Sequence, residues 1–190
     1  MTAQRIVVFV AMVLAAFVIG FASYAVPRWR GGPSTHAVAA ARPTPPPQPG
    51  RKIKARLFYI NDDGTRLTTL EREVPYAETA VDQAHEIVAA QIFPVAEPLV
   101  SAIPPGTTLR ALFLTDRGDA FVDLSKDIVD AHPGGSINEL LTIYTIVNAL
   151  TANMPAIHSV QVLVNGKEVE TIAGHVDVRR PLEKNLALVQ

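Results

Sequence analysis

The stretch Gly134–Leu150, GGSINELLTIYTIVNAL, decides the fold more than any other part of the chain. Ser136 and Glu139 match the Ser-x-x-Glu capping box, in which each side chain satisfies a free backbone N–H at the start of a helix. Apolar residues then recur at helical spacing in a stripe widened by two further isoleucines: Ile137, Leu140, Leu141, Ile143, Tyr144, Ile146, Val147 and Leu150. So broad an apolar surface predicts the central helix of a core.

Upstream of this helix, strand signals surround one shorter amphipathic helix. Asn61-Asp62-Asp63-Gly64 has the chemistry of a turn between two strands, and Pro75 ends the second of them. Thr79 can cap a helix that Pro94 must end. Two more strands and a short helical turn at 127–131 follow. The expected strands and helix are 52–60, 67–74, 79–93, 108–114 and 120–124.

Downstream of the central helix, the chain returns to strand patterns. Residues 159–164 alternate as a strand, Asn165-Gly166 is a strong two-residue hairpin signal, and 168–172 is expected to pair back. The order is strand, strand, helix, strand, strand, helix, strand, strand. It predicts an α+β domain with an antiparallel or mixed sheet and its two main helices packed on one face.

The composition is that of a globular protein of 190 residues, with 48% hydrophobic and 18% charged residues and a formal charge of −1. All 18 acidic residues follow position 60, so the part from Arg51 onward is distinctly acidic. This balance argues against nucleic-acid binding, which requires clustered basic residues. Because the chain has no cysteine, disulfides, thiolate nucleophiles, zinc–thiolate sites and lipidation at cysteine are excluded.

Residues 6–26 form an uncharged apolar run, IVVFVAMVLAAFVIGFASYAV. As a helix this run would span about 30 Å, enough for a bilayer core. It predicts an N-terminal transmembrane anchor (1–26); a cleaved signal peptide is the alternative, since Ser23 and Ala25 offer small residues for a peptidase. Arg28 and Arg30 after the run would favour a cytoplasmic domain by the positive-inside rule. The short, signal-like N-terminus favours export.

Residues 27–50 are rich in Pro, Gly and Ala and poor in large apolar residues, so they predict a linker. Its proline run favours a stiff polyproline II spacer of about 3.1 Å per residue. A proline-rich ligand for an SH3-like partner is the alternative. The folded domain is expected at 51–190.

No motif for catalysis stands out. The chain lacks a Gly-x-Ser-x-Gly elbow, a phosphate-binding Gly-rich loop and clustered metal ligands, so we expect no enzyme activity, no metal and no cofactor. His85 is expected to be a packed or rim histidine rather than a ligand. The region dense in special residues is 123–139, read either as a strand end, loop and helix cap or as backbone N–H groups offered to an anionic ligand or partner. The candidate interaction residues are Asp123, Ser125, His132, Gly134, Gly135, Ser136, Glu139, Asn148 and His175.

An ordered series of short motifs resembles the GerMN domain family of sporulation and spore-germination proteins. The resemblance covers about residues 53–182. No single motif is specific, but their order and spacing together are. The motifs are Ile103-Pro-Pro-Gly-Thr107, Ala120-Phe-Val-Asp-Leu-Ser125, His132-Pro-Gly-Gly-Ser136 with Glu139, Tyr144 with Val147-Asn148, Val160-Gln-Val-Leu-Val-Asn-Gly166, Glu170-Thr171 and Gly174-His175.

The resemblance implies an envelope domain outside the cytoplasmic membrane, with a part in germination or spore-envelope assembly and no catalytic residues. It also implies a fold similar to ring-building modules. The chain departs from the family pattern in having one copy of the domain and no lipidated cysteine. We therefore expect a membrane-anchored domain, held through residues 6–26, that faces the periplasm or cell exterior and serves protein interaction or self-assembly. A binding module for a small envelope ligand, such as a peptidoglycan fragment, is the alternative.

Overall fold

The computed structural model describes residues 50–190, so the predicted anchor (6–26) and all but the last residue of the predicted linker lie outside the described residues. No helix in the described part combines the length and apolar character that a bilayer span requires. The elements in chain order are β1 (Lys52–Ile60), β2 (Leu67–Pro75), α2 (Ala80–Ile92), β3 (Leu109–Leu114), β4 (Asp119–Leu124), α3 (Asp127–Asp130), α4 (Ser136–Asn153), β5 (Ser159–Val164), β6 (Lys167–Glu168), β7 (Leu182–Glu183) and the 3-10 turn η1 (Leu186–Leu188).

The strands form two separate sheets. β1 and β2 make an antiparallel hairpin from Lys52↔Pro75 to Ile60↔Leu67, and the Asn61 side chain organises its turn by accepting the N–H groups of Thr65 and Arg66. In the second sheet, β3 pairs antiparallel with β4, β4 pairs parallel with β5, and both β6 and β7 pair antiparallel with β5. The predicted mixed sheet is thus found, but the first hairpin is not part of it.

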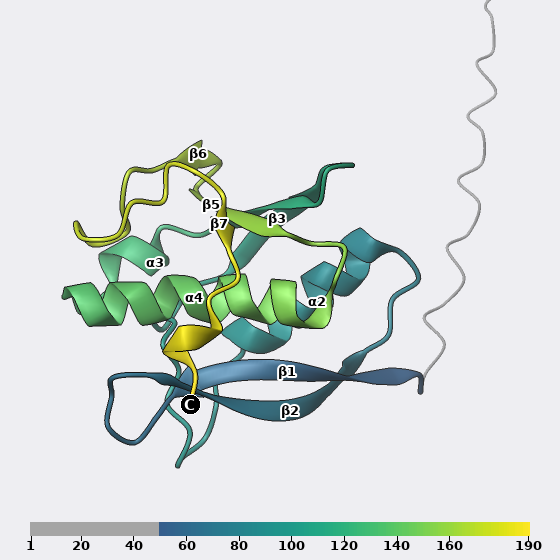
Figure 1. Ribbon diagram of the computed structural model, residues 1–190, viewed down its shortest axis with the longest axis horizontal. Coiled ribbons are helices and arrows are strands. Elements are labelled where there is room, and N and C mark those ends of the chain that lie inside the picture. Colours follow the sequence, from purple (N-terminus) through teal and green to yellow (C-terminus); the bar gives the residue numbers. More distant parts are fainter. Residues whose placement is uncertain (1–49) are drawn as a thin grey trace, which may run out of the picture. The chain divides into compact units, whose positions relative to one another are not determined.

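The two main helices, α2 and α4, lie between the two sheets, with the β1–β2 hairpin on one side and the β3–β4–β5 sheet on the other (Figure 1). Both helices pack on one face of the mixed sheet, as expected, but the sequence did not predict the separate hairpin that covers their other side. The physical reason for this second sheet is the apolar surface of α4, which is too broad for one sheet to cover. Both sides of the helix layer are buried, each against a different sheet.

Eleven of the 18 residues of α4 are buried, which confirms the predicted central helix. Ile143, Ile146 and Leu150 pack in the core shared with the five-stranded sheet. Leu141 and Ala149 pack instead against residues of β1 and β2. One helix thus supplies side chains to two hydrophobic clusters and joins the two sheets.

The start of α2 agrees with the prediction, because the Thr79 side chain accepts the N–H of Asp82 at 3.1 Å. Near its end, α2 contributes a polar contact that the sequence did not reveal. The fully buried Gln91 accepts the N–H of Phe58 at 2.9 Å and donates to the carbonyl of Phe58 at 2.8 Å. Its carboxamide therefore stands where the peptide group of a further strand would stand.

Asn153, the last residue of α4, does the same two positions along β1, at Arg56. Its side chain accepts the N–H of Arg56 at 2.8 Å and donates to the carbonyl of Arg56 at 2.7 Å. Ile60 donates its N–H to the carbonyl of Val100 at 2.9 Å. The outer edge of β1 is thus hydrogen-bonded over residues 56–60 without a neighbouring strand.

The C-terminal part departs from the predicted hairpin. The Asn165-Gly166 turn is present, with φ values of 51° and 75°, but β6 ends at Glu168 instead of continuing to 172. The chain then leaves the sheet and returns at β7, which pairs with the start of β5. The Asn165-Gly166 turn determines the strand pairing only of the first residues that follow it. Beyond them, the side chain of Ile172 is drawn into the core, where it is 3% exposed.

Candidate functional site

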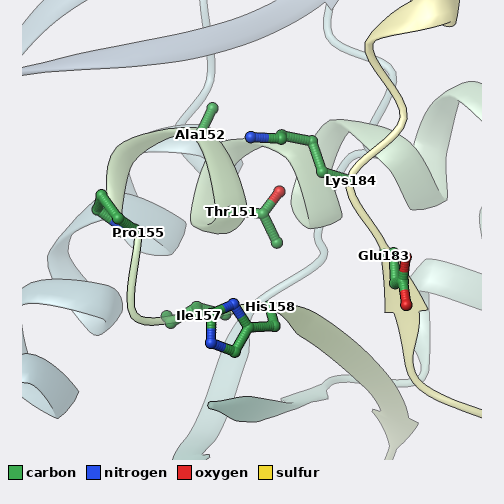
Figure 2. A pocket seen from close by; sticks show the side chains of 7 residues that line it. All are labelled: Thr151, Ala152, Pro155, Ile157, His158, Glu183 and Lys184. Atoms are coloured by element: carbon green, nitrogen blue, oxygen red, sulfur yellow. The ribbon is translucent and has the colours of Figure 1, made fainter.

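A hollow of about 500 Å³ lies at the C-terminal end of α4. It is lined by Thr151, Ala152, Pro155, Ile157, His158, Glu183 and Lys184 (Figure 2). None of the nine residues predicted as interaction candidates lines it. Those nine residues lie elsewhere, and the structure shows what each of them contacts.

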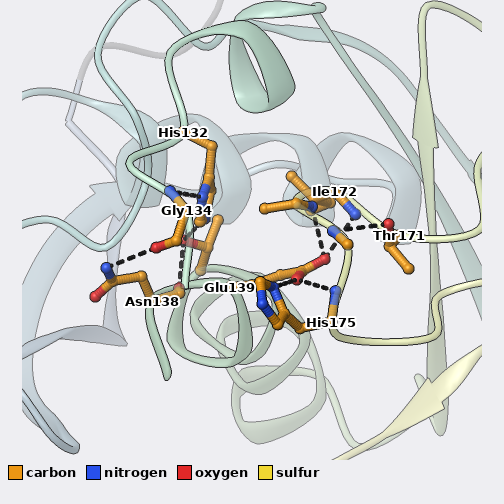
Figure 3. A network of polar contacts seen from close by, with 10 residues as sticks. His132, Gly134, Asn138, Glu139, Thr171, Ile172 and His175 are labelled. Carbon is orange, nitrogen blue, oxygen red and sulfur yellow. Dashed lines mark hydrogen bonds and ion pairs between the residues drawn. The ribbon is translucent and has the colours of Figure 1, made fainter. Parts of the chain in front are cut away.

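Glu139 is the centre of a polar network at the other end of α4 (Figure 3). Its carboxylate is fully buried and accepts three backbone N–H groups, those of Ile172 at 2.8 Å and of Ala173 and His175 at 2.7 Å. Burial by itself raises the pKa of Glu139, but the N–H groups of Ala173, His175 and Ile172 outweigh it, and the pKa lies below its ordinary value. Glu139 is an anchor for the segment 172–175, and the imidazole of His175 lies 3.3 Å from its carboxylate.

The capping box predicted for Ser136 and Glu139 is wrong. The N-cap of α4 is Gly135, and no side chain caps the helix. Gly134 and Gly135 have φ values of 79° and 88°, a region that glycine adopts without strain, and this turn aims the first helical residues. Because Glu139 is held by the loop 172–175, its carboxylate is not available to the start of its own helix.

His132 lies between the same turn and the middle of α4. Its Nδ1 accepts the N–H of Gly134 at 2.9 Å, so Nε2 carries the proton and donates to the Thr142 hydroxyl at 3.1 Å. That hydroxyl donates in turn to the carbonyl of Ala102 at 2.6 Å. Burial lowers the pKa of His132 below its ordinary value, against the opposing effect of the Glu139 charge. The imidazole is held neutral as part of a structural chain of hydrogen bonds.

Asp123 and Ser125 hold the turns around β4. The buried carboxylate of Asp123 accepts the N–H of Gly166 and contacts the Arg110 guanidinium, at 2.6 and 3.1 Å respectively. The Ser125 hydroxyl accepts the N–H of Thr108 at 3.0 Å and donates to Asp127 at 2.8 Å. Neither residue lies near Glu139 in the contacts that the structure shows. Asp123 and Ser125 thus make anchoring contacts apart from the network around Glu139.

Asn148 anchors the last part of the chain. It is fully buried, donates to the carbonyl of Asn185 at 2.9 Å and accepts the N–H of Asn185 at 2.9 Å. Gln161, which the sequence did not single out, has a similar role and donates to the carbonyl of Val178 at 2.6 Å. An amide within an otherwise apolar strand or stripe is the signal that could have revealed Gln161 and Gln91. The pattern common to these residues is a buried polar side chain bonded to the backbone of a distant segment.

No group of three or more potential metal ligands is found among residues 50–190. His85 lies exposed on α2, and His158 lies in the hollow at the end of α4. His175 is 46% exposed and its nearest acidic neighbour is Glu139. Among the described histidines, His132 and His175 lie near enough for the charge of His175 to lower the pKa of His132, but they belong to no group of three potential ligands.

The sequence profile of the Germane family, described as sporulation and spore germination, matches residues 56–170, which is more than half of the chain. This chain belongs to the Germane family. The predicted resemblance to GerMN domains is confirmed. The matched range ends shortly after β6, so the segment 171–190 lies beyond it. That segment is nonetheless part of the fold, since Glu139, Asn148 and Gln161 all bond to its backbone.

Solved structures similar to this chain include the following two. A Clostridium perfringens protein assigned as a lipoprotein is 21% identical with a TM-score of 0.50, over 70% of this chain and 88% of that chain. The tandem GerMN domains of the sporulation protein GerM from Bacillus subtilis are 18% identical with a TM-score of 0.51, over 72% of this chain and 46% of that chain. This chain thus corresponds to about half of the tandem structure, and at these identities the likeness concerns the fold alone. No curated protein sequence matches the chain.

Proposed function

We propose that this chain is a membrane-anchored, extracytoplasmic Germane domain that serves protein interaction or assembly in the cell envelope and catalyses no reaction. The family description of sporulation and spore germination supports an envelope role. The similar Clostridium perfringens protein is assigned as a lipoprotein, a class held at membranes by lipid. Here the cysteine needed for such a lipid is absent, and the apolar run 6–26 would supply the attachment instead.

The proposal that the chain catalyses no reaction rests on what the polar side chains of the family motifs contact. Asp123, Glu139 and Asn148 are buried, and their polar atoms form hydrogen bonds with backbone groups of other segments. A catalytic acid, base or nucleophile must instead reach a substrate from a cleft. These residues fix the shape of the domain, and a fixed shape is what a recognition surface requires.

The outer edge of β3 is the surface that we propose for a protein partner. β3 is the terminal strand of its sheet, and among the strands of residues 50–190 it pairs with β4 alone. Phe113 on this strand is 58% exposed and lies across from Phe121. A free strand edge beside an exposed aromatic side chain is suited to recognition by a further strand, whereas the edge of β1 is largely closed by side chains.

The orientation is tested by fusing alkaline phosphatase after Gln190 in a bacterial host. An active fusion is expected, because this enzyme folds only outside the cytoplasm. An inactive fusion together with an active cytoplasmic reporter at the same site would reverse the topology. The positive-inside signal of Arg28 and Arg30 makes this a demanding test.

The interaction is tested by placing a photo-activated cross-linking residue at position 113 of the full chain in cells. A discrete protein adduct is expected at 113. As the matched control, the photo-activated residue is placed at position 63, where Asp63 is exposed in the β1–β2 turn, and no adduct is expected there. Absence of any adduct at 113, or identical adducts at both positions, would contradict an interface at the β3 edge.

A further inference from the structure

We propose that the hollow at the C-terminal end of α4 binds a short peptide that carries both a free carboxylate and a free ammonium group. This site goes beyond the proposed interaction role and depends on neither the anchor nor the edge of β3. It lies partly in the segment 171–190, beyond the range of the family profile.

The hollow has the size and the mixed lining of a small-ligand site. Its volume of about 500 Å³ lies within the ordinary range for such pockets. Ala152, Pro155 and Ile157 offer apolar surface for a small side chain. Figure 2 shows Glu183 and Lys184 on the wall formed by the C-terminal segment, with Pro155, Ile157 and His158 on the opposite wall. A dipeptide matches these dimensions better than a single ion would.

Exposed charged groups of both signs line the hollow. Among residues 50–190, no ion pair or side-chain hydrogen bond involves Lys184, Glu183 or the His158 imidazole. Lys184 and His158 offer N–H donors to a carboxylate. Glu183 offers a carboxylate to an ammonium group. Recognition of opposite charges at two points of one hollow defines a zwitterion as the ligand class.

The charged side chains of the hollow set the expected orientation of the peptide. The Lys184 side chain extends toward Ala152 in the last turn of α4 (Figure 2), where the helix dipole places partial negative charge. This end of the hollow therefore does not favour an ammonium group. The ammonium end of the peptide is expected toward Glu183, and the carboxylate toward Lys184 and His158.

Both walls are held in place before any ligand arrives. On one side, His158 donates its N–H to the carbonyl of Gly118 at 2.8 Å, and Ser159 donates to Asp119 at 2.7 Å. A Cβ at Gly118 would lie 2.5 Å from the carbonyl oxygen of Ala156, so only glycine permits this close packing of the β3–β4 turn. On the other side, Asn148 makes two hydrogen bonds to the backbone of Asn185. Binding therefore requires little ordering of the backbone on either side of the hollow.

The test is an NMR titration of the full isotope-labelled chain in detergent micelles with the dipeptide alanyl-alanine. Saturable shifts are expected in residues 151–158 and 183–185. The N-acetylated dipeptide and the dipeptide amide, which each lack one charge, should bind more weakly, and the doubly blocked form should not bind. No saturation at millimolar peptide, or equal binding by the free and doubly blocked forms, would overturn the proposal.

The matched variants are Lys184→Ala and Lys167→Ala, both at exposed positions where truncation leaves the core unchanged. Lys184→Ala should weaken binding of alanyl-alanine by about tenfold or more, the effect of losing a charge-assisted hydrogen bond. Lys167 lies on β6, at the opposite end of β5 from the hollow, and its variant should bind as the natural chain does. Unchanged binding by Lys184→Ala, with the shifts still confined to the hollow, would refute carboxylate recognition at this site.

Discussion

Replacing Glu139 by glutamine tests whether the buried carboxylate holds the segment 172–175. The side chain is 0% exposed and accepts three N–H groups at 2.7–2.8 Å. Glutamine keeps one acceptor oxygen and turns an NH₂ group toward an N–H that previously had an acceptor. Loss of one charge-assisted hydrogen bond and a donor facing a donor should lower the free energy of unfolding by about 2–3 kcal/mol. Glu139→Ala, which leaves all three N–H groups without an acceptor, should cost about 3–5 kcal/mol.

The assay is urea unfolding of the fragment 50–190, monitored by circular dichroism. Glu73→Gln is the matched control, since Glu73 pairs with Lys52 at 3.0 Å on the surface and is 63% exposed. It should change the free energy of unfolding by less than about 0.5 kcal/mol. If Glu139→Gln behaved like this control, the carboxylate would not be the anchor that its contacts indicate.

The pH dependence gives a second readout. Because the pKa of Glu139 is lower in the folded protein than its ordinary value of 4.5, the unfolded chain takes up the proton first. The stabilisation is complete above pH 4.5 and is lost as the pH falls through the lower, folded pKa. The stability difference between the natural fragment and Glu139→Gln should therefore shrink on acidification. A difference that stays constant from neutral pH to about pH 3 would refute the reasoning.

Four further outcomes follow from the contacts. Ser136→Ala should change the free energy of unfolding by less than about 0.5 kcal/mol in the same assay, because Ser136 caps nothing; a loss near 1 kcal/mol would restore the capping box. Asn148→Ala should cost about 2–3 kcal/mol and speed amide hydrogen exchange around Asn185; unchanged exchange would contradict the anchor. The lowered pKa of His132 predicts stability lost as the pH falls from about 6.5 through the folded pKa, and His132→Gln should lose that slope while His85→Gln keeps it. The fragment 51–190 should unfold in one cooperative thermal transition, since both cores lie within it; a non-cooperative melt would move the boundary.

Local chemistry predicted many of the elements. Four local features could be predicted because each depends on residues within a few positions of one another. They are the turns Asn61–Gly64 and Asn165-Gly166, the Thr79 cap and the broad apolar stripe of α4. The same was true of the family, whose motifs keep their order along the chain.

The hydrogen-bond partners of the buried polar side chains could not be predicted in this way. Glu139 has the spacing of a capping box, yet its carboxylate binds N–H groups more than 30 residues away. The spacing along the chain shows only which groups could form a hydrogen bond locally. In the folded protein, the N–H groups of the segment 172–175 bind the Glu139 carboxylate in place of the N–H group at the start of its own helix. The contacts of Glu139 and Asn148 are set by the return of the C-terminal segment, and those of Asp123 by the turn at Gly166.

The amino-acid sequence by itself determined the elements, the apolar character of the central helix, the acidic charge of the domain and the family. The tertiary structure alone decided that α2 and α4 lie between two sheets, that Gln91 and Asn153 close the edge of β1, and that Lys184 and His158 line one hollow. The division has one physical cause. Helices, turns and caps are governed by interactions between near neighbours, whereas layers, buried hydrogen bonds and hollows arise where segments distant in the chain compete for the same surface and the same donors.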